Sequence, residues 1–388
     1  MEVNLPVYIY NMKIGFDSKR LFCNFTGLGN YSRTLLRNLD HFYPDNDYYL
    51  YSTKVVDNEV TEEFVDHPDL NIRISEALFK GLWRSFSIKS QLKKDGIELY
   101  HGLSHEIPVN IHKTGIKSVV TIHDLIFKFY PETYAFIDRK IYDFKFRYAC
   151  RHSDRIIAIS ENTKRDIIRF YNIDPEKIDV IYQALNPAFY KLKPQHETDR
   201  IITQLNIPPD YLLSVGTVEP RKNLKKVLEA LTWVNRDLQI PLVVVGKGRK
   251  YKQEAEHFAR QAGLGKSVIW IDNLPANDHL QALYQNAKAL IYPSLYEGFG
   301  LPVTEALLCK TPVITSAGSS LKEAGGPGSL YVNPKDPQEI AAAIEKILTD
   351  ETFRQKMIET GYLYAHQCFA PDNLTRQVIN CYQKTLDS

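Results

Sequence analysis

Short runs of β-branched and aromatic residues alternate with longer amphipathic segments along almost all of this 388-residue chain. Runs such as residues 242–245 (LVVV) are apolar throughout, as strands are when helices cover both faces of a sheet. This alternation predicts parallel sheets joined by right-handed helical crossovers. Because the chain is too long for one ordinary core, two doubly wound α/β domains are expected.

The expected strands form two groups separated by a stretch of weak pattern. They are residues 12–17, 48–52, 71–75, 98–101, 118–123, 155–160 and 179–183, then 211–215, 242–246, 268–271, 289–292 and 312–315. Expected helices include residues 29–39, 137–152, 224–234, 253–262, 277–286 and 303–308, and residues 338–388 have helical periodicity.

The connection between the two groups is rich in proline and charge from residue 186 to 210. We therefore expect an N-terminal domain of residues 1–195 and a C-terminal domain of residues 196–388. It stays open whether the last helix packs back on the N-terminal domain.

The overall composition excludes several classes of protein. A net charge of +2 argues against a nucleic-acid-binding protein with a global basic field. The five cysteines include no C-x-x-C pair, which disfavours both a disulfide framework and a zinc site. No stretch reaches the roughly 18 apolar residues of a membrane span, and the N-terminus does not resemble a signal peptide. A cytoplasmic location, with no metal, is the expectation.

The most informative segment is residues 292–305, YPSLYEGFGLPVTE. A strand ends at its start, a loop with Gly298 and Gly300 follows, and a helix is expected from about Leu301, with Pro302 in its first turn. The backbone N–H groups and positive dipole of such a helix end suit a phosphate, and the glycines allow close approach. Glu297 and Glu305 can accept hydrogen bonds from sugar or ribose hydroxyls, although an ordinary capped connection has a similar pattern.

A second segment carries two cations at the start of a helix. The strand at residues 211–215 leads into residues 216–223, GTVEPRKN. Arg221 and Lys222 oppose the helix dipole there, which favours an anionic ligand such as a diphosphate. A solvated basic turn is the alternative.

These segments resemble those of the family 4 retaining glycosyltransferases of the GT-B fold, the glycosyl transferases group 1. Glu297 and Glu305 are spaced as in that family's E-x7-E motif, and residues 219–223 are similar to its donor-phosphate turn. In the first half, residues 15–17 with 26–31 (TGLGNY), 121–124 (TIHD) and 160–164 (SENTK) resemble the family's glycine loop, its His-Asp pair and a recurring turn.

The resemblance implies two Rossmann-like domains that face a central cleft. It also implies a metal-independent enzyme that moves a hexose, with retention, from a UDP- or GDP-linked donor to a glycan or lipid-linked glycan. The nucleotide sugar is then a substrate, and no cofactor is expected.

The resemblance also implies roles for donor-binding residues. Lys222, helped by Arg221, would neutralise the donor diphosphate, and Glu305 would accept a hydrogen bond from the ribose. The backbone of the next loop would contact the donor sugar and the distal phosphate, through Gly298, Phe299, Gly300 and Leu301. One position departs from the family pattern, because Thr217 stands where many members have arginine.

The remaining implied roles concern the reacting sugar and the N-terminal domain. Glu297 would bind the donor sugar near the reacting carbon, and His123 would contact that sugar, so both are candidate catalytic residues with Lys222. Packing near the phosphates is implied for Gly27 and Gly29. Contact with the acceptor is the expectation for Asn30 and Asp124.

The charge that develops in the reaction suggests a mechanism. Cleavage of the anomeric bond gives an oxocarbenium-like sugar and a diphosphate, which fixed cations and helix amides can stabilise. In a front-side transfer the departing phosphate oxygen takes the acceptor's proton. A double displacement through Glu297 as nucleophile is the rival.

Two segments, residues 79–94 and 137–155, interleave apolar and basic residues. We expect each to present an apolar stripe to the core and a basic face to solvent. The alternative is peripheral contact with an anionic membrane.

Other functions stay open at this stage. A GT-B-fold nucleotide-sugar epimerase or phosphorylase is the nearest alternative, and a non-catalytic nucleotide-sugar binding protein is the alternative from another class. The base, the sugar, the acceptor and the oligomeric state are not indicated by the sequence.

Overall fold

The computed structural model describes residues 11–77, 82–274 and 277–388. Contacts divide the chain into two compact units, one of Met1–Ala184 with Pro371–Ser388 and the other of Leu185–Ala370. The structure divides the chain between Ala184 and Leu185, about ten residues before the boundary at residue 195 that the sequence suggested. The last helix, α17 (Pro371–Leu386), belongs to the first unit, where it packs on a helix and a strand.

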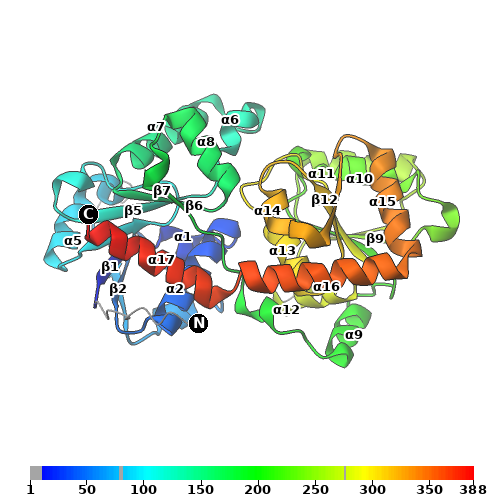
Figure 1. Cartoon of the computed structure of the whole chain (residues 1–388), viewed down its shortest axis with the longest axis horizontal. Helices are drawn as coiled ribbons and strands as arrows, with labels where there is room; N and C mark the ends of the chain where they lie inside the picture. Colours follow the sequence, from blue (N-terminus) through cyan, green and yellow to red (C-terminus); the bar gives the residue numbers. More distant parts are fainter. Residues whose placement is uncertain (1–10, 78–81, 275–276) are drawn as a thin grey trace, which may run out of the picture. The chain divides into compact units, whose positions relative to one another are not determined.

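The first unit is built on a seven-stranded parallel sheet with the order β3-β2-β1-β4-β5-β6-β7 (Figure 1). Its strands are β1 (Lys13–Asp17), β2 (Asp47–Ser52), β3 (Leu70–Ile74), β4 (Leu99–Gly102), β5 (Lys117–Ile122), β6 (Arg155–Ala158) and β7 (Ile178–Val180). Its helices are α1 (Lys19–Cys23), α2 (Gly27–Phe42), α3 (Glu62–Val65), α5 (Ile88–Lys94), α6 (Ile126–Phe129), α7 (Phe136–His152), α8 (Glu161–Tyr171) and α17.

Two apolar layers cover this sheet, one on each face. Ile14 and Phe16 of β1 belong to the layer formed with α1, α2 and α17, whereas Val120 and Ile122 of β5 belong to the layer formed with α5, α7 and α8. Burial on both faces explains why the strands are apolar almost throughout.

The second unit has a six-stranded parallel sheet with the order β10-β9-β8-β11-β12-β13 (Figure 1). Its strands are β8 (Leu212–Val215), β9 (Leu242–Val245), β10 (Val268–Ile271), β11 (Ala289–Tyr292), β12 (Val313–Ser316) and β13 (Ser329–Val332). Its helices are α9 (Gln195–Gln204), α10 (Leu224–Leu231), α11 (Lys250–Gln261), α12 (Asn277–Asn286), α13 (Leu301–Leu308), α14 (Leu321–Gly325), α15 (Pro337–Thr349) and α16 (Glu351–Cys368).

Each sheet therefore reverses its strand order once. The reversal lies between β1 and β4 in the first unit and between β8 and β11 in the second. The loops that leave two such strands diverge to opposite faces of the sheet and open a crevice where ligands bind in doubly wound folds.

The predicted fold class is confirmed, because both units are doubly wound parallel sheets. All the strands expected from the sequence are present, with shifts of a few residues at their ends. The sequence missed β13, and it treated the connection before residue 210 as irregular although that connection contains α9, which packs on α12. Within the described residues, no helix is both long and apolar enough to cross a bilayer.

A close backbone contact fixes the start of α2. A β carbon on Gly29 would lie 1.7 Å from the carbonyl oxygen of Asn24. Arg33 holds the same segment, because its guanidinium donates to the carbonyl oxygens of Leu21 and Asn24 at 2.7 and 2.9 Å. At Gly27, in the same turn of α2, a β carbon would have nothing within 4 Å.

We expect Gly29→Ala to lower the free energy of unfolding by about 1–3 kcal/mol, because the added methyl group must displace backbone. Gly27→Ala is the matched control and should change stability by less than about 0.5 kcal/mol. Urea denaturation of the three proteins measures the difference. Equal destabilisation by both substitutions would contradict the packing argument.

Candidate functional site

The strongest candidate site lies at the strand-order reversal of the second unit. Two loops meet there, one that follows β8 and one that follows β11. The first contains a single 3-10 turn, Pro220–Lys222, and the second runs from Pro293 to the start of α13. These loops contain the two segments that the sequence singled out.

Hydrogen bonds clamp the two loops together. The carbonyl oxygen of Arg221 accepts from the backbone N–H of Leu295 at 2.9 Å, and the Ser294 hydroxyl oxygen lies 3.1 Å from it. The side chain of Asn223 donates to the carbonyl oxygen of Pro293 at 3.1 Å. Asn223 has a φ of 63°, a left-handed conformation that asparagine adopts more readily than most residues. The basic turn is thus held at a fixed place beside the β11 loop.

The Glu297 carboxylate is the centre of a charged cluster between these loops. Its Oε1 lies 2.6 Å from the Lys222 ammonium, and its Oε2 lies 2.7 Å from the Arg221 guanidinium. The hydroxyls of Ser294 and Tyr292 donate to Oε1 at 2.6 and 3.0 Å. The Lys222 ammonium also donates to the Tyr292 hydroxyl.

Nearby positive charge lowers the pKa of the Glu297 carboxyl group by more than burial raises it. The residue is only 7% exposed. Burial alone would raise the pKa of its carboxyl group, but the Lys222 and Arg221 charges and the Ser294 hydrogen bond lower that pKa to about 2. Glu297 is therefore an anion at neutral pH.

The two cations already have protein anions as partners. Arg221 pairs with Glu219 at 2.6 Å as well as with Glu297. Burial lowers the pKa of the Lys222 ammonium, against the opposing charge of Glu297. Glu219 and Glu297 thus balance the two cations within the protein, and binding of an external anion by this turn stays a prediction. A bound diphosphate would have to share or replace these contacts.

The start of α13 lies beside this cluster. Its N-terminal cap is Gly300, with a φ of 123°, and no side chain caps the first turn. A β carbon on Gly300 would meet Leu321 and Ala324 at 2.9 and 3.1 Å, so glycine is required there for both conformation and space. Pro302 occupies the first turn, as the sequence predicts.

Two serines after β12 fix the glycine loop. The Ser320 hydroxyl donates to the carbonyl oxygens of Glu297 and Phe299 at 2.9 and 2.7 Å. The backbone N–H of Glu297 donates to the Ser319 hydroxyl oxygen at 2.9 Å. These bonds set the path of Gly298 and the residues up to Leu301, whose contact with a donor stays a prediction.

Glu305, the second carboxylate of the motif, lies on α13 in a less charged environment. Its Oε2 accepts from the Tyr284 hydroxyl at 2.9 Å. Burial raises the pKa of the Glu305 carboxyl group to about 7, against the smaller effect of that hydrogen bond. Burial also raises the pKa of Tyr292, and the charges of both Glu297 and Glu305 act in the same direction. The charges of both carboxylates of the motif therefore act on the Tyr292 hydroxyl, although of the two only Glu297 is hydrogen-bonded to it among the contacts of the described residues.

His123 lies in the first unit at the end of β5 and is buried. Its Nε2 is 2.9 Å from the Leu103 carbonyl oxygen, and its Nδ1 is 2.9 Å from the Gln183 amide nitrogen. The ring is therefore neutral, with its proton on Nε2, and burial lowers the pKa of its imidazole to about 4. Contact of His123 with a sugar stays a prediction, and it would require release of one of these bonds.

The other expected residues of the first unit have local partners. Gly29 packs on Asn24, whereas Gly27 is exposed. The side chain of exposed Asn30 accepts from Arg33 at 2.6 Å. The Asp124 carboxylate accepts from the backbone N–H of Ile126 at 3.0 Å. Their contacts with phosphate or acceptor stay predictions.

Several polar residues of the second-unit site were missed by the sequence analysis. They are Glu219, Tyr284, Tyr292, Ser294, Ser319 and Ser320. Ser294 and Tyr292 lie inside the segment that the sequence singled out, so a search for hydroxyls next to the motif could have found them. Glu219 lies inside the basic-turn segment and could have been found in the same way, whereas Tyr284, Ser319 and Ser320 come from elements that only the fold brings to this place.

The raised pKa of Glu305 predicts how stability depends on pH. The carboxyl group is protonated in both states below about pH 4, and between about pH 4 and 7 the unfolded chain loses the proton first. Native stability therefore falls across this window, by up to about 3 kcal/mol. Glu305→Gln removes this loss, so the variant should differ little from the wild type near the acid end of the window and exceed it above the window.

Urea denaturation at about pH 4.5, 6.5 and 8 measures this effect. Glu359→Gln, an exposed carboxylate on α16, is the matched control and should follow the wild type. Parallel pH profiles for Glu305→Gln and the wild type would show that Glu305 does not titrate in this way.

Comparisons with known proteins agree with this geometry. Residues 195–364 match the family described as glycosyl transferases group 1, and residues 25–189 match glycosyltransferase family 4. The chain is 30% identical over 289 residues to the O-antigen chain mannosyltransferase B of Escherichia coli, with 74% of each chain covered. It is 29% identical over 276 residues to the serotype-specific mannosyltransferase WbdA of Escherichia coli, covering 67% of this chain but 33% of that longer protein.

A solved structure shares the two-sheet architecture. Anabaena HepE, in complex with UDP and glucose, matches 96% of this chain and 100% of its own chain with a TM-score of 0.75 and 18% identity. Matched by family in both units, and related to a mannosyltransferase over most of its length, this chain belongs to the group 1, family 4 glycosyltransferases of the GT-B fold.

Proposed function

We propose that this enzyme transfers a hexose with retention from a nucleoside-diphosphate sugar to a glycan or lipid-linked glycan, without a metal ion. The observation that carries the proposal is the Lys222–Arg221 pair, fixed beside the uncapped start of α13 at the strand-order reversal. Fixed cations and helix amides are the groups that stabilise a departing diphosphate.

We infer one orientation of the donor in this site. Its diphosphate contacts Lys222 and the amides at the start of α13, and the ribose hydroxyls donate to Glu305. The sugar then extends toward Glu297, whose carboxylate lies beside both cations. HepE, which has a similar fold, is described in complex with UDP and glucose, which supports a nucleotide-linked donor.

The names of the relatives favour mannose as the transferred sugar. Both of the Escherichia coli mannosyltransferases that resemble this chain act in polymer assembly or serotype determination according to their names. We therefore propose GDP-mannose as the donor and polysaccharide assembly as the process, with UDP-glucose as the alternative donor.

The bonding of Glu297 favours the front-side mechanism. Its two oxygens are engaged by two cations and two hydroxyls, and a carboxylate held in this way is a weak nucleophile. In the proposed step the bond from the anomeric carbon to the diphosphate oxygen breaks, and the acceptor oxygen attacks from the same face. The acceptor's proton passes to the departing phosphate oxygen, so no protein nucleophile is needed.

The competing functions give different products. An epimerase would convert the nucleotide sugar without an acceptor, and a non-catalytic binding protein would leave it unchanged. The relatives are named as transferases, which favours transfer. The proposed acceptor residues Asn30 and Asp124, together with peripheral contact between the first unit and a cytoplasmic membrane face, belong to the same proposal.

Lys222→Ala should weaken donor binding by about 10- to 100-fold, because it removes a charge-assisted contact worth about 1.5–3 kcal/mol. Thermal shift with GDP, UDP and their sugars identifies the base, and titration calorimetry with the best ligand gives the dissociation constants. Lys225→Ala, which removes a lysine paired with Glu254, is the matched control. An unchanged dissociation constant for Lys222→Ala would rule out its role in donor binding.

Glu297→Gln should lower turnover by at least about 100-fold while the nucleoside diphosphate binds as tightly as before or more tightly. The substitution removes the anion that competes with the diphosphate for Lys222 and Arg221. Transfer from radiolabelled donor measures turnover, and calorimetry measures binding. Ser294→Ala, which removes one hydrogen bond to Glu297, should have a smaller effect. Wild-type turnover in Glu297→Gln would exclude Glu297 from the chemistry.

A further inference from the structure

The strand-order reversal of the first unit carries a second group of polar residues. Arg20 lies on α1, which follows β1, and His105 lies in the loop that follows β4. The backbone N–H of His105 donates to the carbonyl oxygen of Thr121 near the end of β5 at 2.9 Å, two residues before His123. Because parallel strands end at one edge of a sheet, these residues lie at the crevice where doubly wound folds bind ligands.

His105 has two features that packing alone would not select. Its φ is 63°, a left-handed conformation that is uncommon outside glycine. The residue is only 8% exposed, and its buried Nδ1 has no hydrogen-bond partner among the described residues. The ring is nevertheless fixed, because it stacks on the Phe146 ring at 4.1 Å and the His123 ring lies edge-on at 5.1 Å. Backbone strain and an unsatisfied nitrogen in one fixed residue are typical of a functional position.

Arg20 is a half-buried cation that acts on this histidine. Burial lowers the pKa of both the His105 and the His123 imidazole, and the nearby Arg20 charge lowers both further. The two rings are therefore neutral at neutral pH, and the positive charge of the group belongs to Arg20. Within the part of the chain that the structure describes, its guanidinium has neither an ion pair nor a side-chain hydrogen bond. Partly buried guanidinium groups usually have an anionic partner, and this one lacks it.

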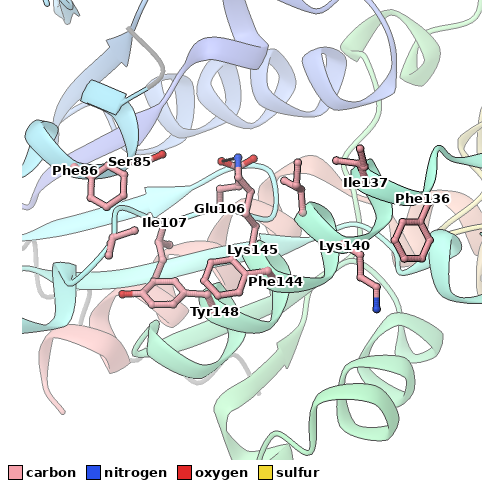
Figure 2. A pocket seen from close by; sticks show the side chains of 12 residues that line it. Ser85, Phe86, Glu106, Ile107, Phe136, Ile137, Lys140, Phe144, Lys145 and Tyr148 are labelled. Atoms are coloured by element: carbon pink, nitrogen blue, oxygen red, sulfur yellow. Dashed lines mark hydrogen bonds and ion pairs between the residues drawn. The ribbon is translucent and has the colours of Figure 1, made fainter. Parts of the chain in front are cut away.

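The acidic residues that follow β1 and β4 are already engaged. Asp17, the last residue of β1, lies 3.6 Å from the Arg84 guanidinium. Glu106 pairs with the same arginine and lies 3.1 Å from the Lys145 ammonium (Figure 2). These pairs leave Arg20 available to an anion from outside the chain.

The open groove beside α7 offers no comparable position for an anion. Its volume is about 500 Å³, one wall is α7, and the other includes the loop after β4 (Figure 2). Ile137 and Phe144 on the α7 wall are each 70% exposed, so the expectation of a core-facing stripe along α7 is wrong for these residues. Of the groove's two lysines, Lys145 pairs with Glu106 and Lys140 is exposed. An anion is therefore better held at Arg20 than in the groove.

We propose that Arg20 and His105 bind an acidic group of the acceptor, a carboxylate or a phosphate carried by the sugar that is extended. This deepens the proposed function, on which it rests, because it assigns the acceptor to the acidic glycans. A guanidinium pairs with two oxygens of such a group, and a neutral imidazole donates its one N–H to an oxygen.

The donor's diphosphate is the other anion of the proposed reaction. Its proposed contacts are Lys222 and the uncapped start of α13, both in the second unit. The acceptor is therefore the source of the anion that the first unit's geometry favours, and the experiment below distinguishes the two sources.

The charge of a small sugar is the variable that tests this site. We would titrate the full chain, without nucleotide, with mannose 6-phosphate, with glucuronate and with the neutral methyl mannoside, and measure each dissociation constant by calorimetry. Both acidic sugars should bind at least about tenfold more tightly than the mannoside, because a hydrogen bond to a charged group contributes at least that factor. Equal affinity for the three sugars, or binding of none of them, would overturn the proposal.

Arg20→Gln should lower the affinity for both acidic sugars to that for the mannoside. Lys19→Gln is the matched control, because it removes the same charge from the exposed neighbouring position. This control should bind all three sugars as the wild type does. An equal loss in both variants would show an effect of net charge and would contradict a site at Arg20.

His105→Phe keeps an aromatic ring against Phe146 and removes both ring nitrogens. The variant should bind the acidic sugars at least about threefold more weakly, because one hydrogen bond to the ligand is lost. Its melting temperature should stay the same or rise, because the unsatisfied nitrogen is lost as well. A lower melting temperature with unchanged binding would show that His105 has a structural role only.

Nucleotide binding in the same variants keeps the two proposals distinguishable. Arg20→Gln should bind GDP and UDP as the wild type does, because the proposed donor contacts lie in the second unit. Weaker nucleotide binding in this variant would assign Arg20 to the donor's diphosphate and overturn the acceptor proposal. If the wild type discriminates the acidic sugars but binds no nucleotide, the proposed function alone fails.

Discussion

The buried Glu297 carboxylate organises the second unit's site, because it is the only group that contacts both cations of the basic turn among the interactions of the described residues. Burying a lone carboxylate is costly, and here two cations and two hydroxyls offset that cost. The arrangement works only because the strand order brings the ends of β8 and β11 together. The Arg221 carbonyl oxygen, held by the β11 loop, then fixes the turn in register with the carboxylate.

Because protein carboxylates neutralise both cations of the basic turn, an anionic ligand would have to be held differently than by two unpaired cations. The cations have full protein partners, so the site presents less attraction to stray anions than two unpaired cations would. A diphosphate could offer charge to Lys222 and Arg221 and also to the backbone N–H groups at the start of α13, where no side chain caps the first turn. A ligand that engages both features has an advantage over a simple anion. Selectivity of the proposed donor site for a diphosphate would then follow from geometry and not from excess positive charge.

The sequence predicts most of the fold because each buried strand is a short apolar run, and such a run is recognisable without knowledge of its neighbours. It misses β13, whose four residues include a serine and a tyrosine and follow a glycine-rich turn. In the site, Arg221 and Lys222 are predicted because they oppose a helix dipole, and Glu297 and Glu305 because they flank a glycine loop, whereas Glu219 is missed. The hydroxyls of Tyr284 and Ser320 are not predicted, since they reach Glu305 and Glu297 only through strand neighbours that the sequence does not specify.

The first unit shows, in a different way, what sequence motifs and periodicity cannot predict. Gly27 and Gly29 match one motif equally well, yet packing requires glycine only at position 29. At position 27 a β carbon would have room, so the motif alone does not show which glycine the fold needs. The helix α7 poses the same problem. Its apolar residues occupy more than one side, so periodicity cannot say which side meets the core. The structure resolves this, because Phe146 is buried whereas Ile137 and Phe144 are exposed along a groove.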